Sequence, residues 1–286
     1  MNNKVFLNNK ICNIEEAKIS IFDRGFLFSD GVYELIPFFN KKPFLFEEHY
    51  KRLENSLKML DLDNPYSKDE WLDKIKMLLN YCEYDNFSLY IQITRGEPLS
   101  YNDGVFREHA AIKKYKTSVS MFFSKINDLS ESFIRCETAI TLDDKRWMQC
   151  DIKSISLLYN SYAKTLASKK GAYEAILFRN GVLTEGCSSN VFIVKNKKII
   201  TPKLSNLILH GITRSYIINE IIKKNKFEIV IDDISEEDLF SSDEVFITNS
   251  TQGILPIIKI NNKKINKGAC GEVSKKIYQL YLKKVN

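Results

Sequence analysis

The segment Cys150-Asp-Ile-Lys153-Ser places a single lysine at the end of an extended run and directly before a predicted helix. A lysine that bonds covalently to a carbonyl group must be neutral for part of its cycle, and burial favours the neutral amine. The chain contains 42 Lys and Arg residues, however, and most of them are expected to be solvated at the surface. Support for a catalytic Lys153 must therefore come from the rest of the chain.

The part of the chain that follows this segment is predicted to mix helices with strands. A helix is predicted from Ser154 to Lys170, and Gly171 is a residue favoured just past a helix end. Strands are predicted at 172–178, 190–195 and 245–248, and further helices at 212–225 and 272–284.

The part that precedes the segment has the same mixed character. Tyr50, Leu53, Leu57 and Leu60 recur at helical spacing and predict a helix that begins at Glu47. The other predicted elements are a helix at 68–84, strands at 5–7, 32–36, 44–46, 87–94 and 133–141, and a long loop at 96–109.

This order of elements predicts an α+β fold, because strands and helices alternate without a strict βαβ rhythm. A polar stretch at 123–130 is typical of a linker between domains. We therefore expect a small N-terminal domain, 1–123, and a larger C-terminal domain, 124–286.

The composition excludes several classes of protein. The 286 residues are 44% hydrophobic, which is enough for a real core, and the net charge of +6 is spread along the chain rather than concentrated in a basic stripe. We therefore expect no nucleic-acid partner. The six cysteines form no C-x-x-C pair and are irregularly spaced, so neither a metal site nor a disulfide framework is predicted. The sequence shows no leader pattern and no apolar run long enough for a membrane, and we expect a cytoplasmic protein.

A second candidate for chemistry is Glu185, in the segment Thr184-Glu-Gly-Cys-Ser-Ser-Asn190. The small residues of this turn allow close packing against a planar group, and a carboxylate here could hold a positively charged ring nitrogen. A hairpin turn with a solvent-facing Glu185 is the simpler interpretation of the same residues.

Two further segments could bind a phosphate. Gly211-Ile-Thr-Arg opens a predicted helix, where unpaired N–H groups attract anions, although many helices begin this way without binding anything. Asn249-Ser-Thr offers hydroxyls at a strand end, and an ordinary turn would have the same residues. Arg52 lies beside the apolar stripe of its helix, so its guanidinium could turn inward toward an anion or form a surface ion pair.

The order and spacing of these segments resemble the fold-type IV class of pyridoxal-phosphate enzymes over nearly the whole chain. The matching segments are Asp30-Gly-Val-Tyr-Glu, Arg52, Cys150-Asp-Ile-Lys-Ser, Thr184-Glu-Gly-Cys-Ser-Ser-Asn and Gly211-Ile-Thr-Arg. The resemblance implies a two-domain architecture with pyridoxal 5'-phosphate between the domains.

The resemblance also implies roles for single residues. Lys153 would bind the cofactor covalently and act as the base, Glu185 would pair with the pyridine nitrogen, and Arg52 would bind the phosphate. Leu209 would pack against the ring. The rest of the phosphate site would be the amides of Gly211, Ile212 and Thr213 and the hydroxyls of Ser250 and Thr251. Transfer of an amino group from an amino acid to a 2-oxo acid is the activity implied.

The segment Arg107-Glu-His109 decides which member of the class is expected. It resembles the substrate-carboxylate site of D-amino acid transaminases, which works with the residue matching Tyr33 and reaches into the partner subunit of a homodimer. A D-alanine type of amino donor and an acceptor such as 2-oxoglutarate are therefore implied. Three features depart from the pattern: the loop is longer than expected, Ser156 replaces an asparagine, and Cys187 replaces a serine.

Three other functions remain open at this point. An L-branched-chain aminotransferase would need an apolar pocket and a different carboxylate anchor. An aminodeoxychorismate lyase would use the same cofactor to eliminate pyruvate. A regulatory protein could bind the cofactor without turnover, but the presence of both Lys153 and Glu185 argues against that.

Overall fold

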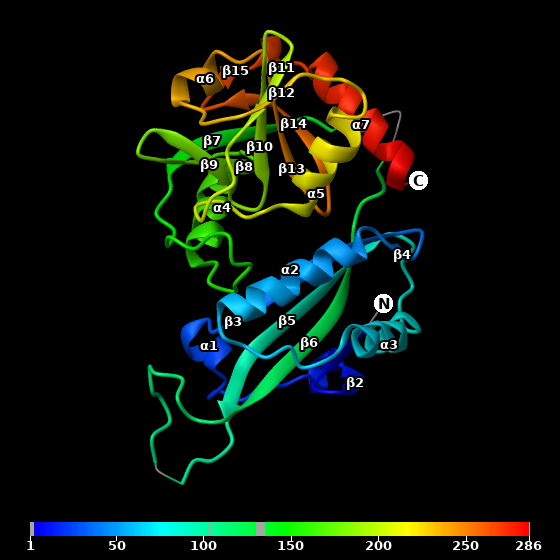
Figure 1. Cartoon of the computed structure of the whole chain (residues 1–286), viewed down its shortest axis with the longest axis vertical. Coiled ribbons are helices and arrows are strands. Elements are labelled where there is room, and N and C mark those ends of the chain that lie inside the picture. The colour runs from blue at the N-terminus through cyan, green and yellow to red at the C-terminus, as the bar shows by residue number, and fades with distance from the viewer. Residues whose placement is uncertain (1–2, 103, 130–134, 286) are drawn as a thin grey trace. The chain divides into compact units, whose positions relative to one another are not determined.

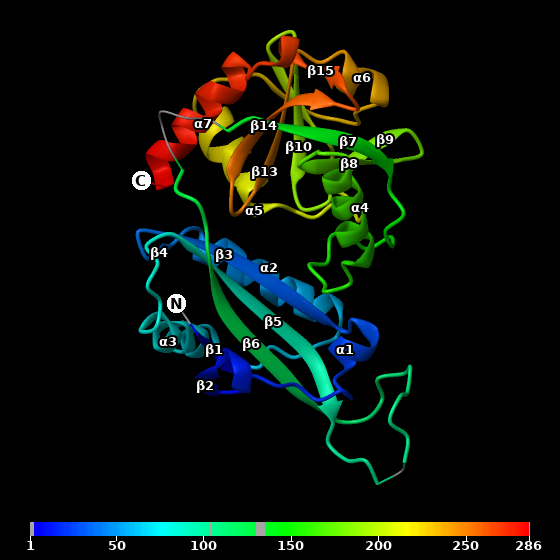
Figure 2. The same ribbon diagram turned by 180° about the vertical axis from the view of Figure 1, so that it is seen from behind.

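The structure is a computed structural model, in which residues 3–102, 104–129 and 135–285 are described (Figure 1, Figure 2). The chain forms two compact units. The first consists of Met1–Asn127 with Ile152–Ser156, and the second of Asp128–Asp151 with Leu157–Asn286. Each unit combines helices with a sheet of its own, which confirms the predicted α+β class. The division predicted between residues 123 and 124 stays a prediction.

The first unit is built on a six-stranded antiparallel sheet with the strand order β2-β1-β6-β5-β3-β4. Its strands are β1 (Lys4–Leu7), β2 (Lys10–Asn13), β3 (Gly31–Phe39), β4 (Lys42–Pro43), β5 (Phe87–Pro98) and β6 (Tyr115–Lys125). Its helices are a 3-10 turn (Ile14–Glu16), α1 (Arg24–Phe28), α2 (Phe46–Met59) and α3 (Lys68–Leu79). Figure 1 shows α2 lying along β3.

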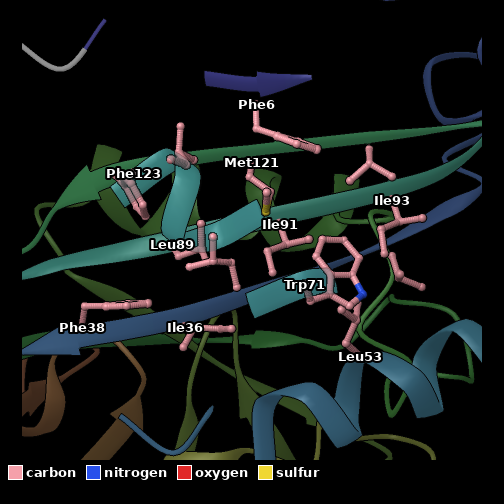
Figure 3. Close-up of a cluster of buried hydrophobic side chains, with 14 of the residues drawn as sticks. Phe6, Ile36, Phe38, Leu53, Trp71, Leu89, Ile91, Ile93, Met121 and Phe123 are labelled. Atoms are coloured by element: carbon pink, nitrogen blue, oxygen red, sulfur yellow. The ribbon is translucent and has the colours of Figure 1, made fainter. Parts of the chain in front are cut away.

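The core of the first unit joins both longer helices to one face of this sheet. Figure 3 shows Trp71 of α3 and Leu53 of α2 turned toward sheet residues such as Ile91. Trp71 is 1% exposed, and its indole N–H donates to Asn64 Oδ1 at 2.9 Å, so no polar atom of the ring is left unsatisfied. Full burial of each large apolar side chain contributes roughly 1.5–3 kcal/mol. This packing gives β3 and α2 a rigid support.

The second unit contains a nine-stranded mixed sheet in the order β12-β11-β10-β13-β14-β7-β8-β9, with β15 paired to β14. Its strands are β7 (Glu137–Asp143), β8 (Glu174–Arg179), β9 (Val182–Gly186), β10 (Asn190–Lys195), β11 (Lys198–Thr201), β12 (Ile229–Ile231), β13 (Glu244–Asn249), β14 (Gly253–Ile260) and β15 (Lys263–Lys264). Strands β7 and β8 run parallel, as do β7 and β14 and β11 and β12.

Helices cover this second sheet. They are α4 (Leu158–Lys169), α5 (Ile212–Tyr216) continued by a π-helical turn (Ile217–Ile222), α6 (Glu236–Phe240), a 3-10 turn (Asn266–Gly268) and α7 (Glu272–Val285). Helix α4 packs on β7 and β8, whereas α5 and α7 pack on β13. Figure 2 shows α7 beside α5. In the ranges 3–102, 104–129 and 135–285, no helix has both the length and the apolar character needed to cross a membrane.

The strand predicted at 44–46 is wrong. The extended chain ends with β4, and Leu45 adopts a left-handed conformation (φ 58°) that turns the chain into α2 at Phe46. Phe46 then packs against the core as a helical residue. The three apolar residues in a row favour a strand, whereas Leu45 is not a residue type that signals a left-handed turn.

The helix predicted from Ser154 begins four residues later, at Leu158. The preceding residues are extended instead, because Ser154 forms a β-bridge with Val32 and the N–H of Ile155 donates to the Gly31 carbonyl at 3.1 Å. Backbone pairing with a distant strand therefore overrides the local preference for a helix.

Other element limits differ less. The helix predicted at 68–84 ends at Leu79, and the one at 212–225 changes to π-helical geometry after Tyr216. Strand β6 continues to Lys125, paired with Phe87, so the first residues of the predicted linker are strand. The predicted loop at 96–109 begins later, because β5 runs to Pro98. Of the strand predicted at 133–141, residues 133 and 134 lie outside the described residues, and the described strand begins at Glu137.

Candidate active site

Lys153 is held by the backbone of the first unit. Its carbonyl accepts from the N–H of Tyr33 in β3 at 3.0 Å, and its own N–H donates to Ser56 Oγ of α2 at 3.2 Å. Ser56 is fully buried in α2. The two contacts place Lys153 on β3 and α2, two elements that the hydrophobic core already fixes.

The ammonium group of Lys153 lies against an aromatic face. Its Nζ is 4.1 Å from the ring centroid of Tyr33, and that ring stacks on Tyr90 with centroids 5.6 Å apart. Lys153 is 9% exposed, and within the described part of the chain no carboxylate lies within ion-pair distance of it. The surface-lysine interpretation is therefore wrong: this amine is desolvated and contacts a π face.

Glu34, the residue after Tyr33, organises the region around Arg52. Arg52 donates from Nη2 to Glu34 Oε1 at 2.6 Å and from Nε to Oε2 at 3.0 Å, and His49 Nδ1 lies 2.9 Å from Oε1. Burial opposes ionisation of Glu34, but the charges of Arg52 and His49 hold the pKa of its carboxyl well below the usual range. The side chain of Arg52 is 10% exposed and Glu34 is fully buried, so the pair is largely buried and not the surface pair considered from the sequence.

Glu185 lies in β9, in the second unit, and is 5% exposed. Its carboxylate accepts from Arg146 Nη1, from the Leu209 N–H at 3.0 Å and from Asn190 Nδ2 at 3.2 Å. Burial raises the pKa of Glu185 to about 7, and the Arg146 charge and the Leu209 N–H oppose that rise. A solvent-facing hairpin glutamate is therefore excluded, and the geometry suits a carboxylate that meets another cation.

Arg146 is a site residue that sequence reasoning missed. It donates to both oxygens of Asp144, from Nε at 2.9 Å and from Nη2 at 2.8 Å, while Nη1 reaches Glu185. Asp144 also pairs with Arg179 Nη2 at 3.1 Å. In the sequence, Arg146 stands in a charged run that is typical of a surface, and only the fold brings β9 beside it.

The segment around Leu209 and Gly211 is tied to Glu185. Asn190 donates to the Leu209 carbonyl at 3.0 Å as well as to the glutamate. Gly211 caps α5, and a Cβ at this position would lie 1.9 Å from Asn190 Oδ1, so only glycine fits without rearrangement. The structure therefore brings together Glu185, Leu209 and the start of α5, which carries Ile212 and Thr213.

The second proposed phosphate segment follows β13. The carboxamide oxygen of Asn249 accepts from the Thr251 N–H at 3.1 Å and from its hydroxyl at 3.2 Å, which folds Ser250 and Thr251 into a turn. Helix α5 packs on β13. Two buried donors in these elements, Thr248 Oγ1 and Arg214 Nε, have no hydrogen-bond partner among the described residues. Unpaired buried donors are costly, and an oxyanion would satisfy them.

Arg107 and His109 lie in the connection between β5 and β6, which projects beyond the ends of those strands (Figure 1). Both side chains contact the ring of Phe28 in α1: the Arg107 guanidinium is 4.6 Å and the His109 ring 5.3 Å from its centroid. The structure therefore brings these two residues together. Within the described residues, the Tyr33 ring lies against Lys153 and Tyr90 and not against this pair. No group of three or more His, Cys, Asp or Glu side chains in the described ranges could hold a metal ion.

The chain is similar to known enzymes over almost its full length. The family model described as amino-transferase class IV matches residues 31–260. A D-alanine aminotransferase of Bacillus licheniformis is 35% identical over 275 residues, 96% of this chain and 94% of the relative. A D-alanine aminotransferase of Listeria monocytogenes is 36% identical over 282 residues, 99% and 96% of the two chains.

Solved structures agree with this result. A branched-chain amino acid aminotransferase of T.th. with pyridoxamine 5'-phosphate is 26% identical, covers 99% of this chain and 94% of its own, and has a TM-score of 0.87. A branched-chain aminotransferase of Thermoproteus uzoniensis, at 24% identity and a TM-score of 0.86 over 99% and 94% of the two chains, shows the same fold. With the family model matching residues 31–260 and these relatives spanning 96–99% of its length, the chain belongs to the amino-transferase class IV family.

Proposed function

We propose that the protein is a pyridoxal-phosphate-dependent aminotransferase that moves the amino group of a D-amino acid, of the D-alanine type, to a 2-oxo acid such as 2-oxoglutarate. The proposal rests above all on the match with D-alanine aminotransferases over 96–99% of the chain. The buried Lys153 and the buried Glu185 supply the two side chains that this chemistry needs.

The side chains present fit pyridoxal phosphate. Lys153 offers a desolvated amine for the aldehyde, Glu185 offers a carboxylate for the ring nitrogen, and Leu209 offers an apolar side chain for the ring. For the phosphate, Arg52 offers a guanidinium group. Two unpaired donors, Arg214 Nε and Thr248 Oγ1, lie in α5 and β13. The other proposed phosphate contacts lie in α5 or directly after β13, namely Ile212, Thr213, Ser250 and Thr251. The cofactor, when bound, supplies an electron sink for the bonds of the substrate's α-carbon.

The residues of the chain then divide the remaining work. Lys153 Nζ would act as the base that takes the proton from the substrate's α-carbon and returns a proton during the transfer. Glu185 holds a proton at the ring nitrogen, and Arg146 keeps Glu185 oriented and favours its anionic form. Glu34 holds the guanidinium of Arg52 in one orientation, so this side chain would need little reorganisation when the phosphate binds.

We infer that Arg107 and His109 bind the carboxylate of the substrate together with Tyr33. An arginine suits this role because its planar guanidinium can bind a carboxylate through two hydrogen bonds. The proposal includes a homodimer in which this pair enters the partner's site, as isologous dimers are the commonest assembly. A cytoplasmic location stays a prediction from the sequence.

A half-reaction tests the proposed activity. The purified, cofactor-loaded protein is mixed with D-alanine and, separately, with L-leucine, and the visible absorbance of the cofactor is followed. We expect the absorbance to fall with D-alanine and to stay constant with L-leucine. Loss with L-leucine alone would assign the enzyme to the branched-chain group, and no loss with either would favour the lyase or a protein without turnover.

Replacing Arg107 with alanine is expected to raise the KM for D-alanine by at least about tenfold, because a charge-assisted pair with the carboxylate is lost. Retention of the cofactor should change less, since Arg107 is not among its proposed ligands. Steady-state kinetics and the cofactor content after dialysis measure the two effects. An unchanged KM would show that this loop does not hold the carboxylate.

A further inference from the structure

Arg24 joins helix α1 to the backbone of the loop that carries Arg107 and His109. Its Nη1 donates to the Glu108 carbonyl at 2.6 Å and its Nη2 to the His109 carbonyl at 2.9 Å. Its Nε donates to Asp30 Oδ2 at 2.8 Å. The side chain is 8% exposed, so these are buried, charge-assisted hydrogen bonds, the stronger kind.

Phe28 adds a second connection between α1 and the same loop. Its ring contacts the guanidinium of Arg24 at 4.7 Å, that of Arg107 at 4.6 Å and the ring of His109 at 5.3 Å. Arg24 and Phe28 are four residues apart and therefore lie on one side of the helix. Helix α1 thus holds the main chain of the loop, and its Phe28 contacts and orients the side chains of Arg107 and His109.

Asp30 fixes Arg24 in turn. Its Oδ2 also accepts from Arg95 Nε at 2.8 Å, and Arg95 donates onward to the carbonyls of Leu60 and Asp61 at 2.8 and 3.0 Å. Burial opposes the charge of Asp30, yet the two arginines hold the pKa of this carboxyl below its usual value. Arg24 and Arg95 therefore share one carboxylate, but of the two only Arg24 donates to the described residues of the loop.

We propose that Arg24 is a positioning residue for substrate recognition: by holding the carbonyls of Glu108 and His109, it aims Arg107 and His109 at the carboxylate of the amino acid. The inference rests on the proposed function of that pair. The connection between β5 and β6 spans residues 99–114, and ordering so long a segment only when substrate binds would cost conformational entropy. Arg24 removes part of that cost by holding the main chain at residues 108 and 109 beforehand.

The test compares Arg24→Met with Arg95→Met in the cofactor-loaded enzyme. Methionine keeps much of the side-chain volume and removes every donor. We expect Arg24→Met to raise the KM for D-alanine by about tenfold with kcat within about twofold. The dissociation constant of propionate, a carboxylate that cannot react, should rise by a similar factor when it is measured from the cofactor absorbance. Arg95→Met, the matched control, should change both constants less than about twofold.

A double-mutant cycle separates positioning from a general structural role. If Arg24 acts through Arg107, the Arg24→Met change should raise KM much less in the Arg107→Ala background than in the wild type. An equal fold-increase in KM in both backgrounds would overturn the inference while leaving the role of Arg107 intact. An unchanged KM in Arg24→Met would do the same. An unchanged KM in Arg107→Ala alone would instead overturn the proposed carboxylate site.

Arg24→Lys guards against a variant that fails to fold. The single ammonium group of lysine can bind Asp30 or one of the carbonyls, but it cannot reproduce the three hydrogen bonds made by the planar guanidinium. We expect a thermal unfolding midpoint close to that of the wild type and a KM between the values of the wild type and Arg24→Met. A wild-type KM in this variant would show that the fixed geometry of the guanidinium is not needed.

Discussion

Replacing Lys153 with alanine is expected to abolish transamination while the fold remains intact. The variant loses both the amine that bonds to the cofactor and the base for the α-proton. A positioned base alone contributes about 10²–10⁴-fold, so kcat should fall by at least about 10³-fold. The fold should survive, because the hydrogen bonds of residue 153 with Tyr33 and Ser56 are made by its backbone. Single-turnover kinetics and thermal unfolding measure the two effects.

Lys164→Ala is the matched control for this prediction. Lys164 also lies over a tyrosine ring, with its Nζ 3.9 Å from the centroid of Tyr173, but it is placed on α4 and is 33% exposed. Removing it should leave turnover within about twofold, because its partners are Glu174 and Tyr173, which have no proposed role at the site. Turnover close to that of the wild type in Lys153→Ala would refute the assignment of the lysine.

Replacing Glu185 with glutamine is expected to slow the half-reaction with D-alanine by at least about 100-fold. A neutral amide cannot stabilise a proton on the ring nitrogen, so the electron sink becomes weaker. Glutamine keeps the shape of the side chain and can still accept from the Leu209 N–H. The loss should not recover as the pH is raised, because the amide has no proton to release.

Arg146→Met is expected to slow the same half-reaction in a way that depends on pH. Burial already raises the pKa of Glu185 to about 7, and loss of the Arg146 charge should raise it further. The variant should therefore resemble Glu185→Gln near neutral pH and recover activity toward pH 9. Arg179→Met, which loses the other arginine bound to Asp144, should not shift the profile, since Arg179 does not touch Glu185. A flat profile for Arg146→Met would contradict this role.

The stability of the cofactor-free protein provides a readout without turnover. An acid whose pKa is higher in the folded than in the unfolded state binds its proton more tightly when folded. The free energy of unfolding should therefore fall as the pH rises from about 4.5 to about 7, by roughly 3 kcal/mol from Glu185. The difference between wild type and Glu185→Gln in urea unfolding isolates this contribution. In Arg146→Met the fall should extend to higher pH.

Regular elements were predictable from the sequence where the local pattern is strong. The strand at Asn190–Lys195 agrees with its prediction at both ends, and the helix predicted from Glu47 to Leu60 is displaced by one residue at each end. In the helix the spacing of apolar residues matches the face that packs on the core, and in the strand the continuous apolar run is buried on both faces. The strand predicted at 44–46 and the helix start at Ser154 failed, because a left-handed Leu45 and pairing with β3 carry no local signal.

The family and its cofactor were predictable from the sequence. The five motif segments, from Asp30-Gly-Val-Tyr-Glu to Gly211-Ile-Thr-Arg, were together sufficient for this, because their order and spacing are rarely produced by chance. The motif residues act on a ligand, and the residue types needed to bind that ligand are visible without a structure.

The tertiary structure decided which charges support those residues. Arg146 with Glu185, and Arg24 with the carbonyl of His109, are 39 and 85 residues apart in sequence. Each arginine stands in a polar stretch that is equally compatible with a solvated surface. A buried charge is stable only where long-range packing brings donors and acceptors together, so its partner is a property of the fold and not of the neighbouring residues.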